Sequence, residues 1–350
     1  MAQTVPQTFS MDGWSASETL PRVSIIIPSF SGCHWLVPCL RALLAQTYSA
    51  HEIVVVDNGS TDGSIELVTT QFPQARLICY QTNRGFAAAI NAGVCATAAP
   101  LIATLNNDTV VDVHWLQRLV EASSADERIG MVASKMLFVE PAGIINSAGI
   151  NIDRAGIAWD RLGGQRDDVS DNKIVDVFGA CAGAALYRRA MFDDIGLFDE
   201  DFFAYMEDVD LAWRAQLAGW RAVYAPTARV THWHSATSIE GSPFKSRLLG
   251  RNKVWLIAKN YPSPYLWFYL PLIGIYDLAA VCYALCVRRE LAPLQGRLLG
   301  LWGLPRFWMK RQLTQAMRRV PSAAVLARMA PLSNPLAVLR RYLHLRPRAT

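Results

Sequence analysis

Two apolar runs end in acidic residues whose types suit the binding of a polar ligand. Residues 53–56 are an unbroken β-branched run, as expected of a parallel strand buried on both faces. Asp57 ends this run, and the Asn58-Gly59 turn and hydroxyl residues that follow suit the capping of a helix. Residues 101–105 are also apolar, and they end in Asn106-Asn107-Asp108. Because open α/β sheets bind ligands at the carboxyl ends of their strands, both carboxylates are candidates for one binding edge.

These residues have specific chemistry and simpler alternatives. Asp57 can accept a hydrogen bond from a pyrimidine N–H or a ribose hydroxyl more strongly than a neutral residue, or it can only cap the helix. Asp108 is a candidate ligand for Mg²⁺ or Mn²⁺, which would neutralise a diphosphate, although Asn-Asn-Asp is also typical of a turn. Arg84 stands before a helix N-terminus, a place that suits an anion, or it is an ordinary exposed arginine.

A second acidic pair, Glu207 and Asp208, opens a strong predicted helix over residues 207–218. Acids in a first turn complement the helix dipole, and a carboxylate here could also act as a general base. His232 and His234 alternate on a predicted strand and so point the same way, an arrangement that is usually structural. We see no Ser/His/Asp or Cys/His arrangement for a covalent nucleophile.

The elements that must position these residues alternate between strand and helix. Strands are predicted at 23–28, 53–56, 75–80 and 101–105, and helices at 34–46, 62–71 and from 83–85 to about 97. This order predicts right-handed βαβ units and a parallel sheet. Neither GxGxxG nor GxxxxGK[ST] is present, which excludes those two nucleotide loops.

After Asp108 the pattern becomes mixed, with short apolar pieces at 131–133, 144–152 and 174–178. The polar, glycine-containing span 160–172 is predicted to be a mobile loop. The small residues of 178–184 suit a wall that something must approach closely.

Composition and charge limit the class of protein. Seven cysteines without a CxxC pair or the spacing of a metal site indicate a reducing compartment. No secretory signal is visible. Residues 1–20 are expected to be a loose lead-in. Residues 291–350 hold eleven Lys and Arg and no Asp or Glu, which leaves 23 basic against 29 acidic residues before them. Such a tail seeks anionic lipid or nucleic acid, but no RNA or DNA module signature is visible.

Six segments occur in an order that resembles the family 2 glycosyltransferases, and most closely the bacterial rhamnosyltransferase-like branch. The similarity covers roughly residues 22–260. It implies an inverting enzyme with a GT-A nucleotide-diphospho-sugar fold, a mixed but mostly parallel sheet flanked by helices. The segments are IIIPSF (25–30), VVVDNGSTDGS (54–64), NRGFAAAINAG (83–93), LNND (105–108), FGACAGAALYRR (178–189) and MEDVDLAWR (206–214).

The resemblance also implies roles for individual residues. The acceptor-activating base is Asp208, with Glu207 as the alternative or as its partner, and a metal is held by Asp108 and His232. The family's usual Asp-x-Asp is Asn106-Asn107-Asp108 here, so one carboxylate remains. The acceptor side is formed by Gly179, Ala180 and Cys181. The donor is held by Pro28, Ser29, Asp57, Asn83, Arg84, Gly85, Asn107 and Asp108.

The implied reaction moves rhamnose or another hexose from TDP-rhamnose or a UDP-sugar to a glycan or polyprenyl-linked acceptor, with Mg²⁺ or Mn²⁺. The expected place is the cytoplasmic face of the inner membrane. Two alternatives stay open, a sugar nucleotidyltransferase and a non-catalytic membrane-associated scaffold of a polysaccharide assembly complex. A nucleotidyltransferase would need a glycine-rich, basic loop near the first strand, and this sequence has none there. The retained acids disfavour the scaffold.

The expected organisation is a lead-in (1–20), a GT-A domain (21–262, with a donor half 21–110 and an acceptor half 111–262) and a hydrophobic, basic helical region (263–350). As a helix, residues 265–287 would measure about 34 Å and could cross a bilayer. One crossing would place the catalytic part and the basic tail on opposite sides, and Asp277 weakens it further. We expect a re-entrant or in-plane segment on anionic lipid; a hairpin with 323–339 and a buried soluble helix are the alternatives.

Overall fold

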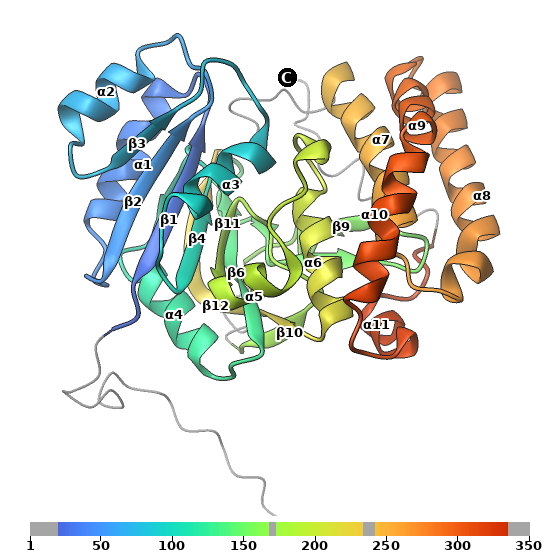
Figure 1. The fold of residues 1–350 in the computed structure, drawn as a ribbon. Helices are drawn as coiled ribbons and strands as arrows, with labels where there is room; N and C mark the ends of the chain where they lie inside the picture. The colour runs from blue at the N-terminus through green and yellow to red at the C-terminus, as the bar shows by residue number, and fades with distance from the viewer. Residues whose placement is uncertain (1–19, 168–172, 234–241, 335–350) are drawn as a thin grey trace, which may run out of the picture.

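The computed structural model describes residues 20–167, 173–233 and 242–334; almost all of the lead-in, part of span 160–172, and His234 lie outside these ranges. The first half of the predicted domain, residues 21–110, forms the parallel sheet that the sequence predicts (Figure 1). β1 (Val23–Ser29) pairs in parallel with β2 (His51–Asp57) and β4 (Leu101–Leu105), and β3 (Arg76–Cys79) pairs with β2. The strand ends that carry Asp57 and Asp108 therefore reach the same edge of the sheet.

The second half continues the same sheet with mixed strand directions. β11 (Ala184–Arg188) runs antiparallel between β4 and β6 (Ile129–Phe138), and β12 (Arg221–His232) lies parallel to β6. β10 (Val175–Val177) pairs with β12 at the edge. The short strands are β5 (Thr109–Val111), which pairs with β12, β7 (Ile145–Ser147), which pairs with β6, and the separate pair β8 (Ile150–Ile152) and β9 (Ala158–Asp160).

Helices cover both faces of the sheet because alternate strand residues are apolar on both sides. Ile26 and Val54 face one hydrophobic cluster, and Ile25 and Val55 face the other. The covering helices are α1 (Cys33–Leu44), α2 (Ser64–Gln71), α3 (Phe86–Cys95), α4 (Trp115–Ser124), α5 (Arg189–Ile195), the short 3₁₀ helix η2 (Glu200–Phe202) and α6 (Glu207–Ala218).

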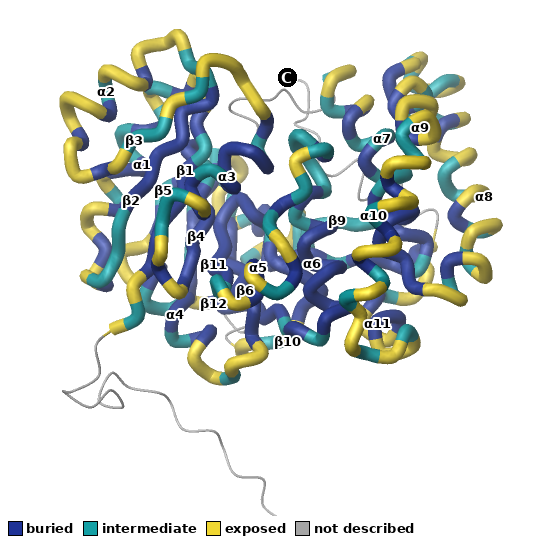
Figure 2. Tube along the Cα trace, in the orientation of Figure 1, coloured by how far each residue is buried: buried dark blue, intermediate teal, exposed yellow. Residues whose placement is uncertain are grey.

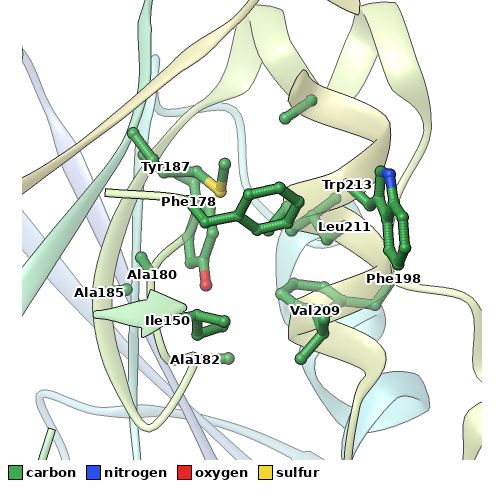
Figure 3. Close-up of a cluster of buried hydrophobic side chains, with 14 of the residues drawn as sticks. Ile150, Phe178, Ala180, Ala182, Ala185, Tyr187, Phe198, Val209, Leu211 and Trp213 are labelled. Atoms are coloured by element: carbon green, nitrogen blue, oxygen red, sulfur yellow. The ribbon is translucent and has the colours of Figure 1, made fainter. Parts of the chain in front are cut away.

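The core beneath the candidate site packs α6 against the small-residue segment before β11 (Figure 3). Phe178 and Trp213 meet edge to face, with ring centroids 6.0 Å apart. A β-carbon added to Gly179 would lie 2.3 Å from the β-carbon of Ala212. The element that approaches this wall is therefore α6.

The C-terminal helices form a separate layer beside α6 (Figure 1). They are α7 (Pro243–Asn260), α8 (Tyr265–Cys286), α9 (Ala292–Trp302), α10 (Leu304–Ala316) and α11 (Ser322–Arg328). The alternative of a second membrane-crossing helix over 323–339 is wrong in its described part, because α11 is seven residues long and ends at Arg328.

The described part of the span 160–172, predicted to be a mobile loop, is a series of turns after β9, and its mobility stays a prediction. The backbone N–H groups of Arg161 and Ile145 donate to Gly149 and Gln165, at 2.7 and 2.8 Å. Asp167 accepts from Lys135 at 2.8 Å. Residues 160–167 are thus tied to the segment 143–149 and to β6.

Candidate active site

The ends of β1 and β2 form the first part of the site. Ser29 stands opposite Asp57 in the parallel register, and the Asn107 side-chain amide donates to Ser29 Oγ at 3.1 Å. Asp57 Oδ1 accepts from the backbone N–H groups of Gly59 and Ser60 at 3.1 and 2.9 Å. Its Oδ2 is buried and has no hydrogen-bond partner among the described residues. One oxygen therefore holds the turn, and the other remains for a ligand donor.

The loop of Asn83, Arg84 and Gly85 is held against this edge by Asn58, a residue that the sequence placed only in a turn. Asn58 Nδ2 donates to Asn83 Oδ1 and to the Gly85 carbonyl, both at 3.0 Å. Its Oδ1 accepts from the Arg84 N–H at 2.9 Å. The Arg84 guanidinium lies over the Tyr80 ring at 4.8 Å. Asn58 thus fixes the loop and leaves the arginine side chain exposed.

Asp108 and His232, far apart in the chain, meet at the end of β12. His232 Nε2 lies 3.1 Å from Asp108 Oδ1, and Nδ1 lies 2.8 Å from Asn146 Oδ1. With Asn146 in this orientation Nδ1 carries the proton, so in the neutral imidazole the Nε2 lone pair faces the carboxylate. Asn106 Nδ2 also lies 3.5 Å from Nε2. Metal-binding histidines commonly donate their other N–H to an oxygen, as Nδ1 does here.

The protein ligands for a metal are few. The described residues contain no group of three or more His, Cys, Asp and Glu side chains that could hold one. Mg²⁺ sites, however, often use one or two protein side chains and complete their shell with waters and substrate phosphates. Asp108 and His232 fit a metal of that kind, which would bind together with a diphosphate.

Asp208 lies in the first turn of α6, where it is partly exposed. Its Oδ2 accepts from the Ala182 backbone N–H at 3.2 Å, and its Oδ1 accepts from the Val209 N–H at 2.8 Å. Burial raises the pKa of Asp208 to about 6, and the charge of Asp160 acts in the same direction. Asp208 is thus ionised at neutral pH and still basic enough to accept a proton.

Glu207 has a different environment from its neighbour. Its side chain is buried, and Oε2 has no hydrogen-bond partner among the described residues. Burial, and then the charge of Asp208, raise the pKa of Glu207 well above its usual range. Between the two acids, Asp208 is therefore the better placed for proton transfer, because it is both ionised and reachable.

Short contacts connect the three acids along one edge. The Ala182 N–H donates to Asp208, and the next residue, Gly183, accepts from the Asn106 N–H at 2.8 Å. Asn107 in turn reaches Ser29, which stands beside Asp57. The structure thus brings Asp57, Asp108 and Asp208 to one side of the sheet.

The acceptor-side prediction needs correction. Gly179 and Ala180 are buried in the core, and Gly179 packs against Ala212 of α6, so neither is open to direct contact with an acceptor. Cys181 is partly exposed and keeps its place at the surface. Asp160, at the end of β9, was missed, since a single acid in a polar span carries no signal in the sequence. Burial is the main cause of the raised pKa of both Cys181 and Asp208, and the charge of Asp160 adds to it. Asp160 therefore lies at this site.

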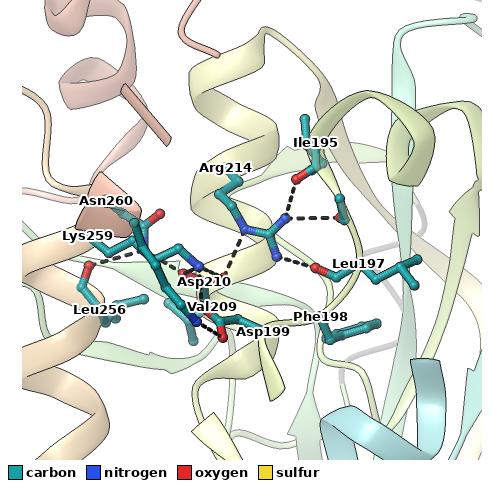
Figure 4. Close-up of polar contacts among 12 residues, drawn as sticks. Ile195, Leu197, Phe198, Asp199, Val209, Asp210, Arg214, Leu256, Lys259 and Asn260 are labelled. Carbon is teal, nitrogen blue, oxygen red and sulfur yellow. Dashed lines mark hydrogen bonds and ion pairs between the residues drawn. The ribbon is translucent and has the colours of Figure 1, made fainter. Parts of the chain in front are cut away.

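A buried network of charged and polar side chains holds α6 against α7 (Figure 4). Asp210 accepts from Arg214, Lys259 and Asn260, at 2.8–2.9 Å. Burial alone would raise the pKa of Asp210, but the charges of Lys259 and Arg214 outweigh it and lower the pKa. Lys259 also pairs with Asp199 at 2.7 Å. The helix that carries Asp208 is therefore anchored to α7 by charged side chains.

The sequence is similar to a known glycosyltransferase family and to several of the proteins in it. The sequence profile described as Glycosyl transferase family 2 matches residues 24–196. An N-acetylglucosaminyl-diphospho-decaprenol L-rhamnosyltransferase of Mycobacterium tuberculosis is 28% identical over 277 residues, which cover 72% of this chain and 84% of that protein. The O-antigen biosynthesis protein RfbC of Myxococcus xanthus is 32% identical over 231 residues, 62% of this chain and 18% of that protein.

A solved structure shows the same fold. The crystal structure of GalNAc-T7 with UDP, GalNAc and Mn²⁺ superimposes with a TM-score of 0.58 at 18% identity, over 72% of this chain and 50% of that chain. This likeness confirms the predicted GT-A fold.

Proposed function

This chain belongs to the family 2 glycosyltransferases, and we propose that it transfers a sugar with inversion from a nucleotide diphosphate to a glycan or lipid-linked acceptor. The observation that carries this proposal is the placement of Asp208, ionised and partly exposed, on the same edge as Asp57 and Asp108. A carboxylate whose pKa burial raises to about 6, on the edge that carries the other two acids, favours an enzyme over a scaffold.

In this mechanism each acid has one task. The free Oδ2 of Asp57 accepts a hydrogen bond from the nucleotide, and Asn107 lies beside it on Ser29. Asp108 and His232 would hold the divalent metal, Mg²⁺ or Mn²⁺, which when bound neutralises the diphosphate leaving group. Asp208 takes the proton of the acceptor hydroxyl as its oxygen attacks the anomeric carbon from the face opposite the diphosphate.

The acceptor is proposed from the relatives. The mycobacterial relative is named for transfer of rhamnose to a diphospho-decaprenol-linked sugar. We propose the same class here, with TDP-rhamnose or a UDP-sugar as donor and a polyprenyl-linked glycan of the cell envelope as acceptor. Residues 21–110 would bind the donor and 111–262 the acceptor, followed by the helical region 263–350.

The C-terminal helices support a place at the cytoplasmic face of the membrane. α8 is the one described helix long and apolar enough to span a bilayer, and little of it is buried (Figure 2). Phe268, Trp302 and Leu313, on α8, α9 and α10, are 75%, 85% and 71% exposed. The acid of α8, Asp277, instead faces inward and pairs with Lys253 and Arg297. Exposed apolar side chains on all three helices, in a layer held together by ion pairs, suit an in-plane, peripheral position.

The basic tail contributes less to this attraction than its charge predicts. All seven described cations of residues 291–334 have partners in the chain, such as Arg319 with Asp194 and Lys310 with Asp201. Four of the seven, Arg297, Arg306, Lys310 and Arg319, pair with acids, whereas Arg311, Arg318 and Arg328 donate to uncharged oxygens.

The decisive experiment is Asp208→Asn, tested for transfer and for donor binding. We expect transfer to be lost while thermal stabilisation by the donor, in a panel of TDP-, UDP- and GDP-sugars with and without Mn²⁺, stays near that of the wild type. Retained turnover would rule out Asp208 as the base. A wild-type protein that no nucleotide-sugar stabilises would favour the scaffold.

A further inference from the structure

The segment that leads into Asp208 has an unusual backbone. Phe203, Tyr205 and Met206 have φ values of 65°, 68° and 68°, although none of them is glycine. Residues without glycine's freedom hold such conformations only where the surroundings impose them, and these positions cluster at functional sites. We call residues 202–206 the base loop, because Glu207 and Asp208 follow it directly.

α7 supplies the contacts that impose this conformation. The side chain of Asn252 is fully buried, and its Nδ2 lies 3.0, 2.9 and 2.7 Å from the carbonyl oxygens of Phe202, Ala204 and Tyr205. The neighbouring Arg251 donates to the carbonyls of Asp201 and Phe202 at 3.1 and 2.8 Å, and it also donates to Asn252 Oδ1 at 2.9 Å. α7 therefore supplies side-chain donors to these carbonyls, of which the Phe202 carbonyl also accepts from the Ala204 N–H at 2.8 Å.

Asn252 lowers the intrinsic stability of its own helix, which indicates that it is kept for another role. Asparagine is a weak helix former, and it stands here in the middle of an 18-residue helix. Its amide spends both hydrogens outside the helix, on a loop fifty residues earlier in the chain. A merely stabilising position in α7 would be filled as well by an apolar residue.

We infer that Asn252 is a positioning residue, which holds the base loop in its strained form so that the Asp208 carboxylate stays beside Ala182 and faces the acceptor. The inference rests on the proposed function, and it adds a residue of the C-terminal helical layer to the catalytic geometry. Asn252 itself does not touch substrate. Its loss lets the base loop relax and moves Asp208 away from the line of attack.

The test compares Asn252→Ala with Asn260→Ala, in the full-length chain. Asn260 is also fully buried in α7, but it donates to Asp210 and to the Leu256 carbonyl, below the base loop. We expect Asn252→Ala to lower kcat by about 30- to 100-fold, as for a catalytic group displaced by roughly 1 Å, with donor KM changed by less than about threefold. Asn260→Ala should cost thermal stability with a much smaller loss of kcat.

The pH profile separates positioning from simple loss of stability. Asp208 is surrounded by Glu207 on its own helix, Asp160 of β9, Cys181 before β11 and Tyr187 of β11. If the base loop relaxes, Asp208 becomes more hydrated, and the acidic limb of kcat/KM should move to lower pH. A protein that is only less stable keeps the wild-type midpoint.

Equal kcat losses and unchanged midpoints in the two variants would overturn the inference, whereas an inactive wild type would instead refute the proposed function. Should Asn252→Ala not fold, Arg251→Met serves, since Arg251 is only partly buried and bonds to the same loop. It is expected to lower kcat and shift the midpoint in the same direction, and wild-type values for both would also overturn the inference.

Discussion

Gly85 and Phe203 touch through their backbones, which joins the proposed donor loop to the base loop. A β-carbon on Gly85 would lie 2.4 Å from the Phe203 carbonyl oxygen, and Gly85 has a φ of 89°. The same oxygen accepts from the Ala87 N–H at 3.3 Å, in the first turn of α3. Any displacement of one loop is therefore passed to the other.

Gly85→Ala should reduce kcat/KM by about 10- to 100-fold, because the added methyl group pushes the base loop and distorts the loop of Asn83 and Arg84. Gly63→Ala is the control, since Gly63 has a φ of 87° but open space around its α-carbon. The control should lose about 1–2 kcal/mol of stability for its left-handed backbone and keep its activity. Steady-state kinetics of both variants check this, and equal activities would contradict it.

The acids that the pairing of strands brings to one edge of the sheet could be predicted from the sequence. Asp57 and Asp108 end buried strands, so their shared edge follows from parallel pairing alone. Helix α6, at 207–218, also matches its prediction, since Gly219 ends it clearly. These parts depend on local patterns of apolar and capping residues.

The parts that could not be predicted depend on distant contacts between polar residues. Asn58 looked like a turn residue, and Asn252 is a single polar residue in a long helix. The partners of Asn252 lie about fifty positions away, and no periodicity connects them. Gly179 was misassigned for the related reason that small residues suit both a ligand wall and a closely packed helix.

The rate should depend on pH through Asp208. Burial raises the pKa of Asp208 to about 6, so kcat/KM should fall as the pH drops below about 6 and the base becomes protonated. Asp160→Asn removes a negative charge that raises this pKa, so the acidic limb should move to lower pH. A pH–rate series for both proteins measures the shift. A limb that moves to higher pH in Asp160→Asn would contradict the assignment.

Asp208→Asn should also make the protein more stable at neutral pH. For an acid whose pKa is raised in the folded state, from 3.8 to about 6, stability falls as the pH rises through that interval and stays low above it. Removing the charge should recover on the order of 1–3 kcal/mol at pH 7.5, according to about 1.4 kcal/mol per pKa unit. The gain should shrink toward pH 4. Urea unfolding at both pH values tests this, and a less stable variant at pH 7.5 would refute it.

Asp210→Ala should be strongly destabilising, by about 3–5 kcal/mol, because it leaves Lys259 and Arg214 buried without their shared carboxylate. Glu121→Ala is the comparison, since its pair with Arg118 lies on the surface of α4 and should contribute less than about 1 kcal/mol. Chemical unfolding of the two variants gives both values. Similar losses would mean that the network of Figure 4 does not anchor α6.

The exposed apolar side chains of α8–α10 give the last prediction. Because four of the seven described tail cations pair with acids of the chain, membrane binding should depend more on apolar contact than on ionic attraction. Wild-type protein should then stay with inner-membrane vesicles in high salt. Phe268→Glu combined with Leu313→Glu should release it, since charges at these exposed positions oppose burial in the lipid interface.

The control for this prediction is Leu44→Glu combined with Ile65→Glu, two exposed apolar residues on α1 and α2 at the opposite side of the molecule. This variant should remain bound, and both variants should keep activity toward a water-soluble acceptor because neither pair lies at the acids. If high salt alone releases the wild type, ionic attraction dominates and the apolar side chains are not the anchor. If Phe268→Glu with Leu313→Glu stays bound, the anchor lies elsewhere in the chain.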